Sequence, residues 1–310
     1  MCALELLLPS LNEQKIIANF LDIETTQIDQ LIAKQKQLIE LLKEKRQAVI
    51  SHAVTKGLNP DVKMKNSGIE WLGDVPEHWD LVKFSHCVSI RNGLVDPTIP
   101  KYLRFWLIAP NHIASGEGRI MELETAEEQG ADSNKYLCKK GEIIYSKIRP
   151  ALVKACLCPS NNVLCSADMY PMTAKLGLKN EYLLWFLLSS VFTRFAVNQA
   201  DRVAMPKINR ESLAECKIPY PSPEEQSKII NYLQTMTKRI DTTTAQALNC
   251  IELMQERRST LISAAVTGKI DVRDWQAAQG CRMSHIQLFR KYPLSFKLPL
   301  CWLHSLTPVT

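Results

Sequence analysis

Basic side chains gather at three points in the middle of the chain. Lys147 and Arg149 stand on either side of Ile148, and Arg91 precedes Asn92. The third group is Arg202, Lys207 and Arg210. Lysine and arginine neutralise phosphates, arginine can bridge the two major-groove acceptors of guanine, and asparagine or glutamine can pair with adenine. Such side chains would suit contacts with duplex DNA, although a single surface cation is more often solvated than bound to a ligand. The candidate contact residues are Arg91, Asn92, Lys147, Arg149, Lys154, Arg202, Lys207 and Arg210, and Asn198 and Gln199 are further candidates for base reading.

The other reactive side chains lack the spacing that catalysis or metal binding requires. Cys156, Cys158 and Cys165 lie close in sequence, but they lack the two-residue spacings of structural zinc sites and a fourth ligand. His78 and His86 have no evident cysteine or carboxylate partner. The sequence contains no phosphate-binding loop ending in Gly-Lys-Ser/Thr and no Asn/Asp-Pro-Pro-aromatic string, which amino-methyltransferases share. We therefore expect buried free thiols, no metal site, no cofactor and no catalytic residue.

The composition is typical of a folded chain. Its 310 residues are 46% hydrophobic and 23% charged, which excludes simple disorder and collagen-like repetition. The apolar stretch 181–192 is too short to cross a bilayer, and Met1 does not open a secretion signal. Ten cysteines without export then indicate reduced thiols and a cytoplasmic location. The net charge of +6 is weak evidence for a polyanionic partner, because residues 273–310 contribute most of it.

A long repeat organises the chain. Residues 9–55 align without a gap onto residues 221–267, so that PSLNEQKIIANFLD matches PSPEEQSKIINYLQ and IELLKEKRQAVISHAVT matches IELMQERRSTLISAAVT. Each copy opens with a capping box, at Ser10 and at Ser222, and closes at a glycine suited to a left-handed C-cap. These signals predict two unbroken helices, each about 65–70 Å long.

Apolar residues recur at a seven-residue spacing in both predicted helices, as they do in coiled coils. We favour a paired rod over two helices of an ordinary bundle, because the repeats flank a complete domain. Periodicity does not decide whether the two helices pair with each other or with another chain. Pairing within the chain predicts an antiparallel coiled coil. The expected interface residues are Leu21, Ile28, Leu31, Leu38, Leu42, Val49, Leu233, Ile240, Met254 and Leu261.

The segment between the predicted helices is typical of a mixed α and β domain. Gly141–Ser146 and Val163–Ser166 are typical of strands, Tyr182–Val197 of a helix, and Lys217–Pro219 of a short extended exit. The expected fold class is therefore α+β, with one globular α/β domain flanked by two long helices. The expected organisation is the end of a preceding domain at 1–9, a helix at 10–56, a linker at 57–70, the globular domain at 71–220, a helix at 221–268, and a disordered tail at 269–310.

Several strings resemble the DNA specificity subunit of type I restriction-modification systems. The strings are SGIEWLGDVPEHW at 67–79, GEIIYSKIRP at 141–150, SAD at 166–168, EYLLWFLLS at 181–189, MPKIN at 205–209, KIPYPSPEEQSKIINYL at 217–233 and TGKIDVRDW at 267–275. The resemblance covers residues 9–275, and the combination is specific although no single string is. It implies a non-catalytic subunit whose target-recognition domain, at 71–220, reads part of a bipartite DNA site. It also implies that the paired helices act as a spacer and as a dock for methyltransferase subunits, which in turn recruit the restriction subunit.

The sequence departs from the family in one respect. A complete member alternates two target-recognition domains with two long helices, so this chain resembles the rear half of such a subunit. Two copies of a half-subunit would form a two-fold dimer that reads a palindromic split site. The alternatives are an inactive truncated or cassette fragment, and a coiled-coil scaffold that binds only protein. No membrane partner is expected, and residues 276–310 receive no role.

Overall fold

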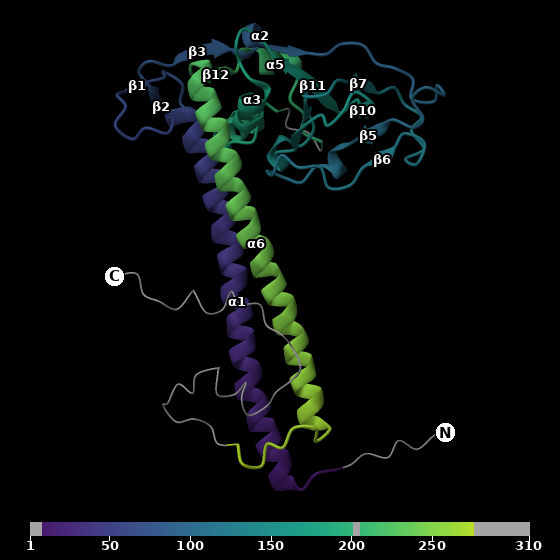
Figure 1. Ribbon diagram of the computed structural model, residues 1–310. Helices are drawn as coiled ribbons and strands as arrows, with labels where there is room; N and C mark the ends of the chain where they lie inside the picture. Colours follow the sequence, from purple (N-terminus) through teal and green to yellow (C-terminus); the bar gives the residue numbers. More distant parts are fainter. Residues whose placement is uncertain (1–7, 201–204, 276–310) are drawn as a thin grey trace. The chain divides into compact units, whose positions relative to one another are not determined.

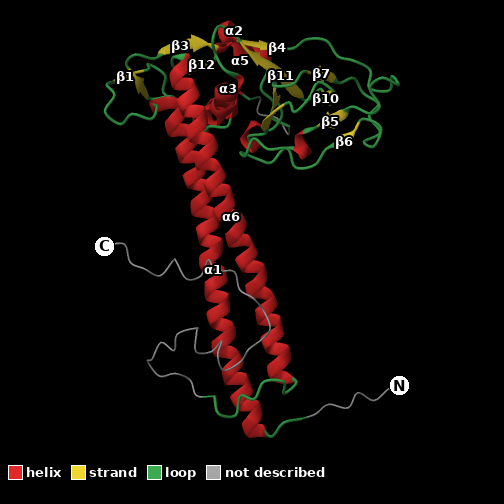
Figure 2. Cartoon of the chain, in the orientation of Figure 1, coloured by secondary structure: helices red, strands yellow, loops and turns green. Residues whose placement is uncertain are grey.

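The computed structural model describes residues 8–200 and 205–275, and these residues divide into two compact units. The first unit contains the described residues up to 34 and from 250 onward, and the second contains those between 35 and 249. Figure 1 labels the elements, and Figure 2 shows how helices and strands are distributed among them. The expected mixed α and β class with two long helices is confirmed.

Both long helices begin at the expected capping residues. The Ser10 amide donates to the Glu13 carboxylate at 3.0 Å, and the Glu13 amide donates to the Ser10 hydroxyl at 3.3 Å, which completes the capping box. The Ser222 hydroxyl caps the second long helix in the same way. The first long helix ends before Gly57, whose φ of +76° is readily adopted only by glycine. The two helices are α1, Leu11–Lys56, and α6, Pro223–Val266.

Segments of α1 and α6 pair antiparallel within each unit (Figure 1). In the first unit, Arg258 Nε of α6 lies 3.0 Å from Asp29 Oδ1 of α1. In the second unit, Arg46 Nε of α1 lies 3.1 Å from Asp241 Oδ1 of α6. The two ion pairs join equivalent positions of the repeat with the roles of the helices exchanged. Pairing of the two copies within one chain, which periodicity left open, is therefore what the structure shows.

The buried stripe of α1 keeps the seven-residue spacing but differs in part from the expected residues. Leu38 is 39% exposed, whereas the neighbouring Ile39 is buried, and Ile32 is buried as well. Ile32, Ile39, Arg46 and Ala53 are all buried and lie seven residues apart, so the repeat is kept and this buried position falls one residue later than expected. Of the other expected interface residues, Leu21, Leu31, Leu42 and Val49 are half-buried, and Ile28, Leu233, Ile240, Met254 and Leu261 are buried.

The second unit contains a lobe of short strands, formed by the segment that lies between α1 and α6 in the sequence. Its larger sheets have the strand orders β4-β11-β8-β9 and β6-β5-β10-β7, and two pairs of strands, β1-β2 and β12-β3, stand apart. All pairs are antiparallel except β5 with β10. The strands are β1 Met64–Asn66, β2 Asp74–Pro76, β3 Asp80–Lys83, β4 Val88–Ile90, β5 Trp106–Ile108, β6 Glu124–Thr125, β7 Tyr136–Cys138, β8 Ile143–Ser146, β9 Ala155–Leu157, β10 Val163–Cys165, β11 Met169–Ala174 and β12 Lys217–Tyr220.

Strands β8, β10 and β12 lie where the sequence predicted extended segments, and β1 lies within the stretch 57–70 that was expected to be a linker. The pairing of β3 with β12 brings the beginning and the end of the lobe together. The fully buried hydroxyl of Tyr182 lies 3.1 Å from the carbonyl oxygens of both Val54 and Pro219, which ties the lobe to the end of α1. Burial raises the pKa of this hydroxyl, so it remains a hydrogen-bond donor.

The single helix predicted over 182–197 is wrong, because the segment forms two helices that break at Ser189. The buried Ser189 hydroxyl accepts from the Phe192 amide at 3.1 Å and donates to the Phe186 carbonyl at 2.6 Å, so it caps the second helix and closes the first. Both helices contribute to the main core of the unit, which contains Phe186, Phe192 and Trp79. The short helices are α2 Phe84–Cys87, α3 Asn180–Leu187, α4 Ser190–Gln199 and α5 Arg210–Glu215, and two 3-10 turns are η1 Pro110–His112 and η2 Pro150–Leu152.

No helix among the described residues combines the length and the apolar character that a membrane span requires.

Candidate nucleic-acid interface

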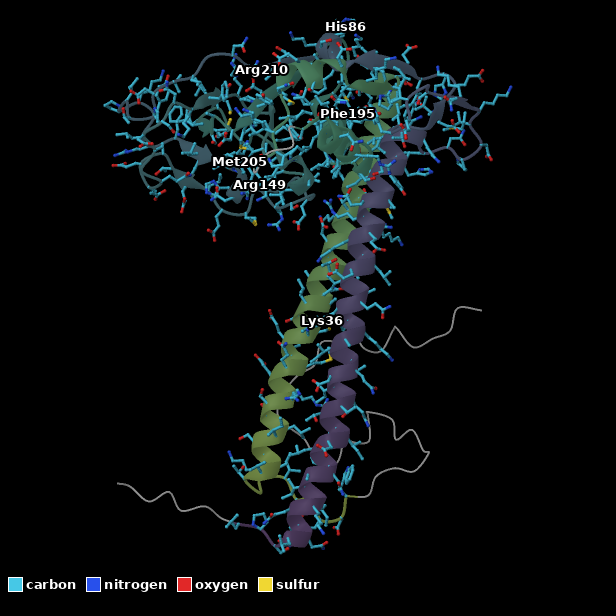
Figure 3. The ribbon with its side chains drawn as sticks, turned by 180° about the vertical axis from the view of Figure 1, so that it is seen from behind. Lys36, His86, Arg149, Phe195, Met205 and Arg210 are labelled. Atoms are coloured by element: carbon cyan, nitrogen blue, oxygen red, sulfur yellow. The ribbon has the colours of Figure 1, made fainter. Side chains whose placement is uncertain are left out.

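Residues 147–154, which join β8 to β9 and are called the β8–β9 turn below, bring two predicted cations together. Ile148 forms an isolated antiparallel bridge with Lys207, and the Arg149 amide donates to the Pro206 carbonyl at 2.7 Å. The side chains of Arg149 and Lys207 are both exposed. Figure 3 shows Arg149 close to Met205, which precedes Pro206. Two segments about 60 residues apart in sequence are therefore brought together, and each carries one exposed cation.

The β8–β9 turn holds an unusual backbone. Arg149 has φ 47° and Val153 has φ 49°, and the 3-10 turn η2 lies between them. Left-handed conformations are uncommon for residues other than glycine, and a β-branched residue such as Val153 adopts them only under constraint from its surroundings. The turn exposes Leu152 at 42%, and the adjoining Met205 is 50% exposed. The result is a fixed projection with an arginine and apolar side chains at its surface.

Lys147 and Lys154 are held by the lobe itself. Lys147 Nζ donates to the Ala167 carbonyl at 2.8 Å and lies 5.5 Å from the centre of the Tyr170 ring. Lys154 Nζ donates to the Pro110 carbonyl at 2.6 Å. Both side chains are half-buried, so each cation stabilises the β8–β9 turn from within.

Arg91, Asn92 and Arg210 are brought together, but by contacts with one another and with the core. Arg91 forms an ion pair with the buried Glu142. Arg210 donates to the Asn92 side-chain oxygen at 2.6 Å and to the Arg91 carbonyl at 2.7 Å. The Arg210 guanidinium also lies 5.2 Å from the centre of the Tyr170 ring. The two arginines are engaged in the fold, which leaves Arg149 and Lys207 as the exposed cations among the described candidates.

The remaining candidates for base reading lie on or beyond α4. Asn198 and Gln199 are exposed in its last turn. Arg202 lies outside the described residues.

The cysteines expected to be free thiols lie in the core of the second unit. Cys156, Cys158 and Cys165 are buried together with Cys138, a neighbour that the sequence spacing did not reveal. Burial raises the pKa of Cys156 to about 12, so its thiol is uncharged and unreactive at neutral pH. Among the described residues, no group of three or more histidine, cysteine, aspartate or glutamate side chains is arranged to hold a metal ion.

The two histidines considered for catalysis occupy surface positions. His78 Nε2 lies 3.0 Å from Glu225 Oε1, next to the buried Trp79, whose indole N–H donates to the same oxygen at 3.3 Å. His86 is exposed at the end of α2. His78 therefore joins the first turn of α6 to the lobe through Glu225.

Sequence reasoning missed Arg46, which the structure shows to be a buried contact between α1 and the lobe. Its guanidinium donates to the carbonyls of Gly116 and Glu117 in addition to Asp241. One signal in the sequence could have drawn attention to Arg46, because Arg258 is the same residue at the equivalent position of the repeat. That identity does not reveal which groups Arg46 contacts.

Comparisons with known proteins show which proteins this chain is similar to. Residues 108–253 match the model of the type I restriction modification DNA specificity domain. The chain is 30% identical over 285 residues to the type I restriction enzyme EcoDI specificity subunit of Escherichia coli, an alignment that covers 87% of this chain and 63% of the relative. It is 26% identical over 283 residues to the MjaVIII specificity subunit of Methanocaldococcus jannaschii, with 86% of this chain and 62% of the relative covered.

A solved structure that concerns complex assembly and conformational transition of the type I R-M system shares the fold. It superposes with a TM-score of 0.63 at 13% identity, over 85% of this chain and 61% of that one. The chain thus spans less than two thirds of the length of the relatives that it matches. The resemblance predicted from the sequence strings is confirmed.

Proposed function

We propose that the lobe, most of which lies within residues 108–253 that match the type I restriction modification DNA specificity domain, binds duplex DNA and recognises a specific sequence. The observation that carries this proposal is that Arg149 and Lys207 are exposed on two backbone segments that the bridge between Ile148 and Lys207 brings together. Phosphate contacts by these cations supply affinity and orientation. Arg149, on its fixed turn, can also reach a guanine edge. Asn198 and Gln199 are the candidates for reading adenine.

The half-buried cations have a structural role in this proposal, which differs from the DNA-contacting role of the exposed cations. Lys147 and Arg210 both lie near the Tyr170 ring, and Lys154 is bound to a carbonyl, so these residues shape the surface that Arg149 and Lys207 present. Their substitution should reduce the stability of the lobe more than it reduces its attraction for phosphate.

Titration of labelled duplex DNA at several salt concentrations tests the proposal. Each phosphate contact that is lost should lower the slope of log affinity against log salt by about one. We expect this reduction for Arg149→Ala and for Lys207→Ala, and no change for Lys36→Ala, which removes an exposed lysine of α1 (Figure 3). Selection of bound sequences from a random duplex pool then identifies the target. Absence of binding at low salt would refute DNA recognition and favour the alternative of a protein-binding scaffold.

We also propose that the chain is a non-catalytic specificity subunit, or half-subunit, that directs methyltransferase subunits, and through them the restriction subunit, to a bipartite site. The support is the similarity to specificity subunits, together with a long α1 and α6 pair whose outer faces are polar and accessible to other subunits. Profiling DNA methylation in cells that carry the chain with and without its partner subunits tests this role. Methylation at a split site that depends on the chain is the expected result, and its absence would favour an inactive truncated or cassette fragment.

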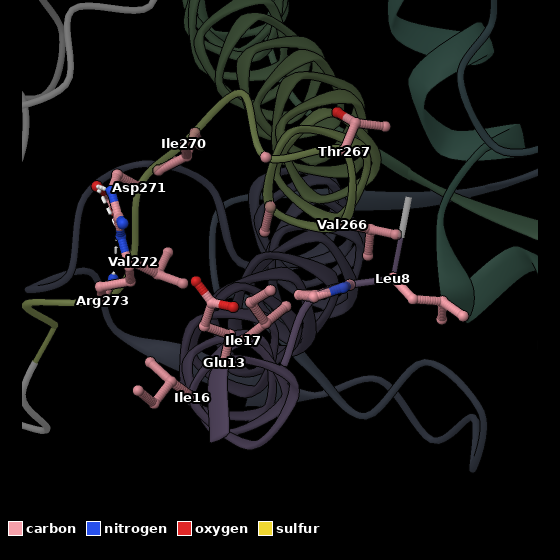
Figure 4. Close-up of a pocket in the computed structure, with 13 residues that line it drawn as sticks. Leu8, Glu13, Ile16, Ile17, Val266, Thr267, Ile270, Asp271, Val272 and Arg273 are labelled. Atoms are coloured by element: carbon pink, nitrogen blue, oxygen red, sulfur yellow. Dashed lines mark hydrogen bonds and ion pairs between the residues drawn. The ribbon is translucent and has the colours of Figure 1, made fainter. Parts of the chain in front are cut away.

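The exposed end of the first unit supports a two-fold dimer. Val54 and Val266 occupy equivalent positions of the repeat, but Val54 is fully buried in the second unit whereas Val266 is 60% exposed. Leu8 and Leu11 are also largely exposed at this end, where the surface encloses a hollow of about 670 Å³ (Figure 4). An exposed apolar patch of this kind marks an interaction site.

We propose that the patch packs against the same patch of a second copy, because an isologous contact uses one surface twice. Two copies would then bring two lobes to a palindromic split site. Sedimentation of the chain at several concentrations tests the contact. We expect a dimer that Val266→Asp converts to a monomer, whereas a wild-type chain that is monomeric at all concentrations would refute it.

A further inference from the structure

Arg46 is a buried cation that joins α1 to a loop of the lobe. It is 7% exposed, although it lies on a helix whose other charged residues are exposed or half-buried. Its Nε binds Asp241 on α6, and its two terminal nitrogens donate to the carbonyls of Gly116 and Glu117. Hydrogen bonds from a charged group in a buried site are stronger than neutral ones. The side chain therefore fixes this loop to the helix pair.

The same loop holds the β8–β9 turn. The Gly116 amide donates to the Val153 carbonyl at 2.9 Å, and the Ser115 hydroxyl donates to the Leu152 carbonyl. Val153 is one of the two residues of the turn with a left-handed backbone, a conformation that persists only when neighbouring groups constrain it. A continuous set of hydrogen bonds thus leads from Arg46 through residues 115–117 to the turn that carries Arg149.

Side chains do not completely fill this junction. A cavity of about 430 Å³ lies between the helices and the lobe, and its lining includes Arg46, Gly116, Val153 and Asp241. Side chains around an open cavity lack the close contacts that would otherwise resist displacement. The hydrogen bonds of Arg46 therefore contribute to the constraint on the loop at this junction.

The repeat supplies an internal comparison for Arg46. Arg258 is the same residue type at the equivalent position of α6, and its Nε binds Asp29 on α1, as Arg46 binds Asp241. Its side chain is 39% exposed, whereas that of Arg46 is buried. The ion pair with an aspartate of the other helix is thus common to both arginines. The hydrogen bonds to the loop carbonyls are a further contact made by Arg46.

We propose that Arg46 is a positioning residue for DNA recognition, which holds the β8–β9 turn in its DNA-binding conformation through the loop 115–117. The proposal rests on the proposed function of the turn. Arg46 itself is buried away from the exposed cations, so it acts through Gly116 and Val153 and makes no contact with DNA.

The test compares Arg46→Met with Arg258→Met in the full chain. Both substitutions remove a guanidinium from an equivalent position of the repeat and retain an unbranched side chain with good helix propensity. We expect Arg46→Met to weaken binding to the selected target by about tenfold, the usual effect of one lost base contact. Binding to unrelated duplexes and the salt slope should stay as in the wild type, because no phosphate contact is removed. Arg258→Met should leave all three quantities unchanged.

Hydrogen exchange in the absence of DNA provides the second readout. Arg46→Met should increase the exchange rates of the Gly116 and Val153 amides by about tenfold or more, with no change in the exchange of the amides of β11. Gly116→Ala perturbs the same contact from the other side, since Gly116 has φ +69° and an added β-carbon would lie 3.1 Å from the Gln47 side chain. It should reproduce both effects if Arg46→Met fails to fold.

The outcomes separate the two proposals. Unchanged exchange at Gly116 and Val153 in both variants would overturn the positioning role, whatever the affinity for DNA. Equal losses of affinity in Arg46→Met and Arg258→Met would overturn it as well, because the effect would then come from the helix pair. Failure of the wild-type chain to bind any duplex would instead refute the proposed function.

Discussion

Replacement of one valine in each copy of the repeat should have very different effects on stability. Val54 is fully buried in the main core of the second unit, whereas Val266 is 60% exposed in the first unit. Valine to alanine removes two methyl groups, which corresponds to about 1.6 kcal/mol of lost transfer free energy at a fully buried site, and the cavity left behind adds about 1 kcal/mol. Scaled to its partial burial, the transfer loss at Val266 is about 0.6 kcal/mol, without a cavity contribution. The higher helix propensity of alanine offsets up to about 0.6 kcal/mol in either helix.

We therefore expect Val54→Ala to lower the free energy of unfolding by about 2 kcal/mol and Val266→Ala to change it by less than about 0.5 kcal/mol. Urea unfolding followed by tryptophan fluorescence measures both, because Trp79 is buried in the same core as Val54 and Trp275 packs on Phe20 in the first unit, which contains Val266. The measurement belongs at a protein concentration at which the chain is monomeric, since a dimer contact would bury Val266. Equal losses in the two monomeric variants would refute the assignment of different surroundings to these equivalent residues.

Three further substitutions test single contacts. Ser189→Ala should lower the free energy of unfolding by about 1–2 kcal/mol through loss of the α4 cap, which thermal unfolding would detect, and an unchanged melting temperature would contradict the capping role. Burial opposes ionisation of Glu225, but hydrogen bonds from His78 and Trp79 outweigh it and hold the pKa of the carboxyl below its usual value of 4.5. The stabilising contribution of the Glu225 carboxylate is therefore fully present above pH 4.5 and is lost as the pH falls through the lowered pKa. Glu225→Gln should flatten the dependence of the free energy of unfolding on pH in this range. A dependence as steep as that of the wild type would exclude the contribution. Lys154→Ala should reduce stability by about 1 kcal/mol without changing the salt slope of DNA binding, whereas a slope lowered by one would make Lys154 a phosphate contact.

The two long helices were predictable because their signals are local. A capping box such as that of Ser10 and Glu13 and an uninterrupted helical pattern depend only on residues a few positions apart. The break at Ser189 was not predicted, because apolar residues at helical spacing continue through it. Only the burial of its hydroxyl between two helix ends shows that Ser189 closes one helix and opens the next.

The candidate interface was predictable only as a set of cations. Lys147, Arg149 and Lys154 are neighbours in sequence, but Arg149 alone among them is exposed, since carbonyls of the lobe bind the two lysines. The bridge between Ile148 and Lys207 depends on strand pairing between distant segments, which no local pattern records.

The repeat, the two helices that it encodes and the class of domain between them all follow from the amino-acid sequence alone. The repeat also fixed identical residues at equivalent positions, such as Arg46 and Arg258, but it could not assign their surroundings. Only the tertiary structure decided that Arg46 is buried against the carbonyls of Gly116 and Glu117 while Arg258 is partly exposed. The physical reason is that helix formation follows from neighbours in sequence, whereas burial and hydrogen bonding follow from whichever distant segment packs against the helix.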